Sequence, residues 1–368
     1  MHVPDGMINL PVSAAAGVVA AGAVAVSLRG ARRELGSGPL AEGHGAERTA
    51  PLAGLVAAFV FAVQMLNFPV AAGTSGHLLG GALAAILVGP YTGVLCIAVV
   101  LLMQGILFAD GGLTALGVNI TVMGVVTVIV SYGIFRGLLR VLPRGRRSVT
   151  VSAFVGALVS VPAAAAAFTL LYAIGGTTHI PIGKVLTAMV GVHVLIGIGE
   201  AAITALTVGA VIAVRPDLVH GARGLAAPLK LRVDGELVDA PAAVPAAAPA
   251  SSRSPRGLLA AGLGTALLLA GVVSFYASAN PDGLEKVAAD KGIDKKVEEH
   301  AAADSPLADY GIEDISNTRL SGGLAGMIGV GATVVVGSGI FYVVHRRRTT
   351  DNAPVSSGPS ASSSAERA

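Results

Sequence analysis

Residues 185–214 read VLTAMVGVHVLIGIGEAAITALTVGAVIAV, an apolar run in which His193 and Glu200 are the only ionisable side chains. A helix needs about 20 mostly apolar residues to cross the hydrocarbon core of a bilayer, so this run is long enough to span one. Of the 368 residues, 53% are hydrophobic and 13% are charged, whereas about a quarter of a soluble domain is charged. The composition therefore predicts an integral membrane protein and excludes an ordinary soluble enzyme.

Nine runs of this kind occur in the chain, and together they predict an all-α integral membrane protein. The other eight lie at 10–28, 51–67, 74–90, 91–109, 116–136, 149–174, 257–279 and 322–344. The runs at 51–67 and 74–90 are short and rich in glycine, so a tilted or re-entrant segment is an alternative to a full span there. We expect a seven-helix bundle from the first seven runs and a two-helix C-terminal module from the last two.

The basic residues predict the orientation of the chain. Nineteen of the 25 Lys and Arg residues lie after the runs 10–28, 116–136, 185–214 and 322–344, which end on one side. Positive loops favour the cytoplasmic side, so we expect the N-terminus outside the cell membrane and the C-terminus in the cytoplasm. An odd number of spans also requires opposite sides. The loop at about 280–320 carries ten acidic residues and is expected to be extracytoplasmic.

An Ala/Pro/Ser-rich stretch divides the chain. Residues 241–256 read PAAVPAAAPASSRSPR, a composition that cannot form a core. The predicted parts are a seven-span domain, a cytoplasmic linker, a two-span domain and a disordered cytoplasmic tail, at 1–214, 215–256, 257–345 and 346–368. The single cysteine, Cys96, excludes an intrachain disulfide.

The N-terminal residues 1–6, MHVPDG, carry the first candidate metal-binding group. They lack the basic region of a signal peptide, and because His2 is large we expect Met1 to be retained. The Met1 amine, the His2 amide nitrogen and the His2 ring then close two adjoining chelate rings. Three nitrogens in one plane suit Ni(II) or Cu(II) and leave a position for a second imidazole. The alternative is an accidental histidine, although Asp5 lies in a turn that folds the segment back.

A second candidate is His77, in the segment Gly73-Thr74-Ser75-Gly76-His77. Its glycines would allow the N-terminal segment to approach closely. The alternative is that Thr74 or Ser75 caps a helix and that His77 packs on an apolar face. The predicted orientation places both histidines and the free amine on the same side, which favours a shared metal site.

Further polar residues lie near these segments. Gln104, Asp110 and Asn119 are expected to hydrogen-bond between helices, with direct ligation as the alternative. His193 and Glu200 lie two turns apart on one helical face, which favours a packing or lid-supporting role over a proton or metal relay. His179, in the loop before 185–214, is a further candidate that could approach the site.

The chain lacks the motifs of the common enzymes. No Gly-x-x-x-x-Gly-Lys-Ser/Thr segment occurs, because Gly183-Lys184 is followed by Val185. The chain is therefore not expected to bind ATP through a P-loop. It also contains no His-Glu-x-x-His motif. An intramembrane enzyme that uses His193 and Glu200 has little support, so we expect a protein that is not an enzyme.

Four segments together resemble the CbiM/NikM family, the substrate-capture components of energy-coupling factor transporters for cobalt and nickel. These segments are MHVPDG at 1–6, NFPVAAGTSGHLLGGALAAILVGP at 67–90, QGILFADGGLTALGVN at 104–119 and HVLIGIGEAAIT at 193–204. The resemblance implies about seven spans and a metal held by the Met1 amine, the His2 amide and ring nitrogens, and His77. It also implies Ni2+ or Co2+ as transported substrate, no cofactor, a transmembrane T component (CbiQ/NikQ-like) and separate ATPase subunits (CbiO/NikO-like).

The segment Asn280-Pro281-Asp282-Gly283-Leu284-Glu285 resembles the PDGLE domain, which is similar to the small CbiN/NikN subunits with two spans. The resemblance implies a role in loading the metal. The ten acidic residues of this loop would attract cations, or they form a solvated surface. The alternative function is a metal sensor or assembly scaffold that binds the same ion without net transport. The sequence leaves the choice between nickel and cobalt open.

Overall fold

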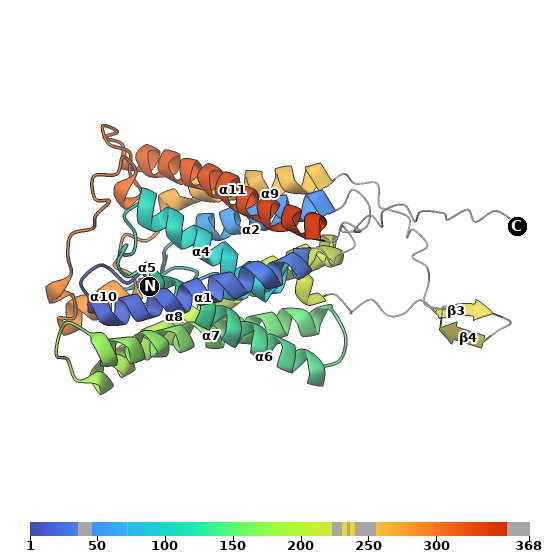
Figure 1. The fold of residues 1–368 in the computed structure, drawn as a ribbon, viewed down its shortest axis with the longest axis horizontal. Coiled ribbons are helices and arrows are strands. Elements are labelled where there is room, and N and C mark those ends of the chain that lie inside the picture. Colours follow the sequence, from blue (N-terminus) through green and yellow to red (C-terminus); the bar gives the residue numbers. More distant parts are fainter. Residues whose placement is uncertain (36–45, 72, 223–229, 234–235, 240–254, 352–368) are drawn as a thin grey trace, which may run out of the picture.

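The computed structural model describes residues 1–368 apart from 36–45, 72, 223–229, 234–235, 240–254 and 352–368. Its helices run roughly along one long axis (Figure 1). The first 214 residues contain α1 (Leu10–Leu35), α2 (Ala46–Gln64), α3 (Gly81–Val88), α4 (Pro90–Leu107), α5 (Leu116–Asn119), the π-helix η2 (Ile120–Val126), α6 (Thr127–Val141), α7 (Arg146–Gly175) and α8 (Ile182–Val214). Later helices are α9 (Pro255–Gly271), the 3-10 helix η5 (Val273–Tyr276), α10 (Gly283–Lys291) and α11 (Thr318–Asp351).

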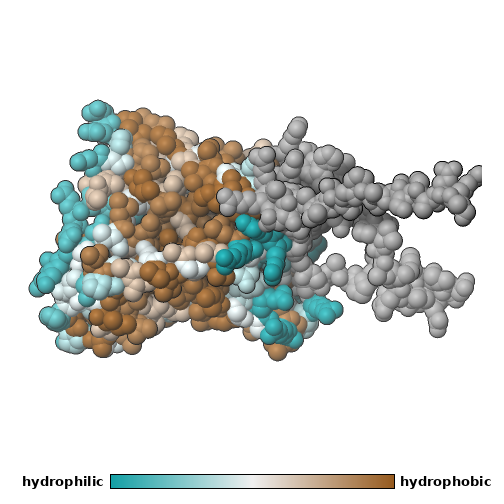
Figure 2. Space-filling view, in the orientation of Figure 1, coloured by the Kyte–Doolittle hydropathy of each residue, from teal (hydrophilic) through white to brown (hydrophobic). Residues whose placement is uncertain are grey.

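Seven segments of the described residues are long and apolar enough to cross a bilayer. They are Leu10–Leu35, Pro90–Leu107, Leu116–Val141, Arg146–Gly175, Ile182–Val214, Leu259–Tyr276 and Thr318–Val344. The predicted run 51–67 forms a shorter apolar helix, Pro51–Gln64. Apolar side chains cover the middle of the molecule, and hydrophilic ones lie toward its ends (Figure 2). The chain is therefore an all-α, multi-pass membrane protein, as predicted.

The helix predicted over 74–90 is wrong in its extent. Only α3 is helical there, and eight residues span about 12 Å at 1.5 Å per residue. Two short antiparallel strands, β1 (Phe68–Pro69) and β2 (Ser75–Gly76), precede it. Gly80 has a φ of 82°, a conformation that favours glycine. The segment still runs along the bundle, from His77 beside Met1 to Gly89 beside Glu34 near the end of α1.

The C-terminal helices pack on the first bundle. Helices α9 and α11 lie beside α2, and α11 also contacts α4. Small residues allow the close approach, as is common between membrane helices. A Cβ on Gly329 of α11 would collide with the ring of Phe61, and Gly54 of α2 lies against Ser338. This packing carries the interhelical loop 277–317, which includes α10, to the end of the bundle where residues 1–9 lie.

Part of the predicted linker is folded. It contains η3 (Pro216–Leu218), η4 (His220–Ala222), β3 (Lys230–Val233) and β4 (Glu236–Asp239). Val219, between the two 3-10 helices, is fully buried, and β3 pairs with β4 in antiparallel register. The backbone of α11 continues to Asp351, inside the predicted tail 346–368. The Ala/Pro/Ser-rich part of the linker at 241–254, and the tail beyond residue 351, lie outside the described residues.

Candidate metal centre

The N-terminal segment is folded back and held by side chains from the loop before α5 and from α5 itself. The amide of Asn119 accepts a hydrogen bond from the Val3 N–H (2.8 Å) and donates one to the Val3 carbonyl (3.1 Å). The Asp5 carboxylate accepts hydrogen bonds from the Thr114 N–H (2.8 Å) and hydroxyl (2.5 Å). The Gly112 N–H donates to the Val3 carbonyl at 2.9 Å. Asn119 therefore holds the backbone of the segment, and Asp5, which belongs to the segment, anchors it to the neighbouring loop.

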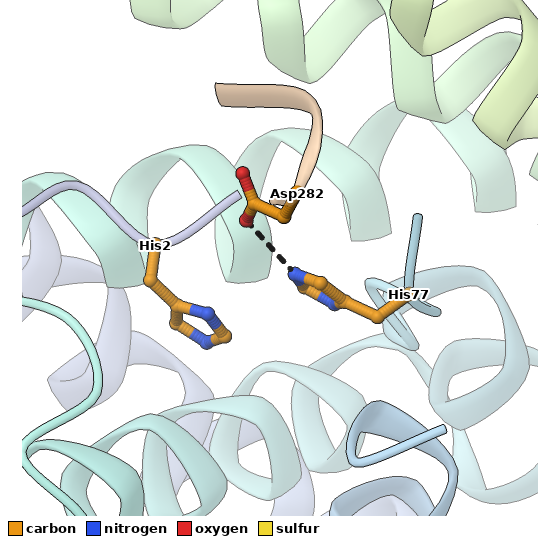
Figure 3. Close-up of side chains that lie close together, drawn as sticks. All are labelled: His2, His77 and Asp282. Carbon is orange, nitrogen blue, oxygen red and sulfur yellow. Dashed lines mark ion pairs between the residues drawn. The ribbon is translucent and has the colours of Figure 1, made fainter. Parts of the chain in front are cut away.

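The amino group of Met1 is buried between two side chains. Met1 is 2% exposed, and its nitrogen lies 2.5 Å from His77 Nε2 and 2.5 Å from Asp282 Oδ2. The same carboxylate oxygen lies 3.5 Å from His77 Nε2 (Figure 3). The structure thus brings Met1 and His77, which the sequence singled out, together with Asp282, for which the sequence indicated no role in the site.

The turn after β2 orients His77. Its Nδ1 lies 3.0 Å from the Leu78 carbonyl oxygen. A proton on Nδ1 would be donated there, which leaves the Nε2 lone pair directed at Met1. Glu200 of α8 accepts hydrogen bonds from the next two backbone N–H groups, those of Leu79 (2.6 Å) and Gly80 (3.0 Å). Glu200 therefore supports the turn that carries His77 and does not contact the Met1 amine.

The His2 ring stacks on the His77 ring, with centroids 5.1 Å apart and planes at 15°. Its Nε2 lies 3.1 Å from Gln104 Oε1, and its Nδ1 lies 3.1 Å from Asp110 Oδ1. Burial lowers the pKa of His2 to about 4, although the Asp110 carboxylate opposes this shift. The ring is therefore neutral at neutral pH, which is the form that binds metals.

These side chains form a compact group of potential ligands. One ligand atom from each of His2, His77 and Asp282 lies within 4.8 Å of the others, and no other such group of His, Cys, Asp or Glu occurs among the described residues. Metal–nitrogen bonds measure about 2 Å in zinc sites, so ligands on opposite sides of one ion lie about 4 Å apart. The group is therefore the right size for a single ion.

Asp282 reaches the site because the PDGLE segment begins a helix. One carboxylate oxygen, Oδ1, accepts the Glu285 N–H at 2.8 Å, and Glu285 Oε2 accepts the Asp282 N–H at 2.9 Å. This reciprocal pair is a capping box, and it leaves Oδ2 directed at Met1. Burial opposes ionisation of Asp282. The positive charge of the N-terminus outweighs it and holds the pKa of Asp282 well below the ordinary value. The spacing Asp-x-x-Glu was the sequence signal for this cap.

The interhelical loop covers the N-terminal segment. Ser75 donates its backbone N–H to the Pro281 carbonyl and its hydroxyl to the Asn280 carbonyl, both at 2.8 Å. The Glu298 N–H donates to the Asp5 carbonyl at 3.0 Å. The Tyr310 hydroxyl donates to Asp110 Oδ2 at 2.7 Å. Ser75 therefore binds the loop, and neither Thr74 nor Ser75 caps α3, whose N-cap is residue 80.

The remaining candidates lie outside the ligand group. Thr74 is buried in the same turn, where its backbone pairs with residues 70 and 71. His193 Nδ1 lies 2.7 Å from the Met189 carbonyl one turn earlier in α8, and its ring packs near Gly283. His179 is exposed in the loop between α7 and α8.

A cavity of about 980 Å³ lies beside the ligand group, between the first bundle and the interhelical loop. Its lining includes His2, His77, Asp110, Asp282, Glu285 and Tyr310. Apolar side chains such as those of Met65, Phe108 and Phe275 complete the lining, so the cavity places polar and acidic groups beside the ligand group within a mixed surface.

Comparison with known proteins assigns both parts of the chain. Residues 2–218 match the family described as the cobalt uptake substrate-specific transmembrane region (CbiM), and residues 256–346 match the PDGLE domain. A putative metal transport protein of Haloquadratum walsbyi is 39% identical over 219 residues, which cover 60% of this chain and 93% of that protein. A putative fused nickel transport protein NikMN of Archaeoglobus fulgidus is 37% identical over 225 residues, with 60% of this chain and 68% of that protein covered.

A solved structure has a related fold. The crystal structure of a transition metal transporter superposes with a TM-score of 0.50 at 26% identity, covering 58% of this chain and 93% of the other. The family match spans more than half of the sequence, and the residues that it covers include both His2 and His77. The chain therefore belongs to the CbiM family of cobalt-uptake transmembrane proteins and carries a PDGLE domain after it.

Proposed function

We propose that this chain is the substrate-capture component of an energy-coupling factor importer for Ni2+ or Co2+. The ligands are the Met1 amine, the amide and ring nitrogens of His2, and His77. One observation carries the proposal: a buried N-terminal amine lies 2.5 Å from His77 Nε2, with the His2 ring stacked beside it. The names of the relatives, which include cobalt and nickel transport proteins, support the choice of ion.

The ligand set explains why the ion would be bound at the chain terminus. An amine, the following amide nitrogen and an imidazole on the same residue need no long-range folding to form a chelate. They offer three nitrogens in a plane, and His77 supplies the fourth. Such a field suits Ni(II), and Cu(II) would bind it more tightly still, so the supply of each metal contributes to selectivity.

The proposal includes the orientation and the partners. The basic loops favour an extracytoplasmic N-terminus and a cytoplasmic C-terminus. The domain division is a capture domain at 1–214, a linker at 215–256, a PDGLE domain at 257–345 and a tail at 346–368. ATP hydrolysis would come from separate subunits coupled through a transmembrane component, since this sequence has no P-loop.

Uptake by cells tests the function. Cells that express this chain with its transmembrane and ATPase partners should accumulate labelled nickel or cobalt, and cells that express the chain alone should not. The variant His2→Ala with all partners is the control for uptake by other routes. Binding to the purified chain without accumulation in the complete system would favour a sensor or scaffold over a transporter.

Proton release is expected when the ion binds. At neutral pH the His2 ring is already neutral, because burial holds its pKa at about 4. The Met1 amine and the His2 amide can coordinate the ion only without their protons, so binding releases protons and the affinity falls as the pH falls. Titration calorimetry in two buffers with different heats of ionisation measures the number of protons released. Binding without proton release would contradict an amine–amide site.

A further inference from the structure

The second module places one carboxylate directly against the proposed ligands. We propose that Asp282 is the counter-ion of the capture site. It balances the positive charge of the Met1 ammonium before the ion binds and that of the metal–nitrogen group afterwards. The CbiM and PDGLE modules would then form one binding site. This inference rests on the proposed function, because it assumes that the ion binds at Met1, His2 and His77.

The geometry holds the carboxylate in place. Asp282 is 7% exposed and shares its two oxygens between two tasks, since Oδ1 caps α10 and Oδ2 contacts the Met1 nitrogen at 2.5 Å. Ser75, two residues before His77, binds the two carbonyls that precede Asp282. Helix α10 packs on α8. The carboxylate therefore cannot turn away without breaking the start of α10.

Asp282 faces positive charge in both states. Without the ion, its Oδ2 contacts the Met1 ammonium at 2.5 Å and lies 3.5 Å from His77 Nε2. An ion held by Met1 and His77 would lie beside the same oxygen and carry a charge of 2+. A buried positive charge without a partner is strongly unfavourable, so the fixed carboxylate favours the site that holds the ion.

Asp110 is the competing candidate for this role. Its carboxylate contacts His2 Nδ1 and the Tyr310 hydroxyl, and its side chain is 27% exposed, compared with 10% for Asp282. No contact between Asp110 and the Met1 amine is present among the described residues. Asp110 therefore orients the His2 ring. Asp282 faces the Met1 amine, where the ion is proposed to bind.

The variant Asp282→Asn tests the proposal on the full chain with its native N-terminus. Asparagine is also a good N-cap, so α10 is retained while the charge is lost. Calorimetric titration with nickel or cobalt chloride should show binding weakened by about 10–100-fold, as for other groups around a metal site. One ion per chain and the visible spectrum should be unchanged, because Asp282 is not a ligand. Asp290→Asn, an exposed position on the same helix, should bind as the wild type does.

Three results would overturn the proposal. Affinity within about twofold of wild type would show that no counter-ion is needed. Tighter binding would show that Asp282 competes with the ion for the amine. Weaker binding with a changed visible spectrum would show that the carboxylate is a ligand. A chain extended before Met1 is titrated in parallel. If the extended chain binds the ion normally, the proposed N-terminal site itself is wrong. If the extended chain loses binding, any of the three results above contradicts only the role proposed for Asp282.

Discussion

Adding two glycines before Met1 is expected to abolish high-affinity binding of nickel or cobalt. The extension converts the Met1 amine into an amide and moves the free amine away from His77 Nε2. It also has to pass between Met1, which is 2% exposed, and the side chains of His77 and Asp282. The segment cannot shift to make room, because Asn119 binds both backbone groups of Val3. Both the donor and the geometry of the chelate are therefore lost.

Calorimetry and the visible spectrum measure this effect. The unmodified chain should bind one ion tightly, and its nickel form should be yellow and diamagnetic if four nitrogens lie in a plane. The control carries the same two glycines after Ala368 and should bind normally. The intact mass of each protein checks which residue is first. Equal binding by the two extended chains would place the ion elsewhere and would remove the basis for an N-terminal site.

The substitution His77→Ala is expected to weaken binding by more than about 100-fold. Loss of a residue that merely supports a metal ligand costs about 10–100-fold, and His77 is proposed to be a ligand itself. The other three nitrogens, from Met1 and His2, remain, so weak binding with a water molecule in the fourth position is expected. The visible spectrum of the nickel form should change accordingly.

His179→Ala is the matched control, since His179 is an exposed histidine in the loop between α7 and α8. The unfolding temperature of each metal-free variant in detergent checks that the fold is retained. If His77→Ala binds the ion as tightly as His179→Ala does, His77 is not a ligand. His193, which packs near Gly283 of the second module, would then be the next candidate.

The residues of the proposed site are either adjacent to Met1 in the sequence or far from it. The three nitrogens of Met1 and His2 are adjacent, His77 lies 76 residues away from Met1, and Asp282 lies 281 residues away. Chemistry alone predicted the first group, because covalent geometry sets the chelate rings. The Gly-rich segment and the predicted orientation made His77 a candidate, and the resemblance to a family implied that it is the fourth ligand. Asp282 was quoted as part of the PDGLE segment, yet nothing in the local sequence indicated that the segment packs against the N-terminus.

For other polar residues as well, the sequence predicted a role but not the partner. The sequence predicted hydrogen-bonding roles for Gln104 and Asn119, but their partners, the His2 ring and the Val3 backbone, depend on the folded-back N-terminus. Glu200 was grouped with His193 because the two share a helical face. In the structure Glu200 binds the backbone after His77, and no hydrogen bond between Glu200 and His193 is present among the described residues.

By itself the sequence determined the class of the protein, because the length of an apolar run decides whether a helix can cross a bilayer, and that is a local property. It also predicted the donor set of the proposed terminal chelate, since those atoms are covalently close. Only the tertiary structure decided that residues 74–80 form a short strand and a turn instead of the start of a helix, since the carboxylate that binds the backbone of Leu79 and Gly80 comes from α8. The tertiary structure likewise placed a charge from the second module beside the amine. Burial makes such a partner favourable, and burial arises only when distant segments pack together.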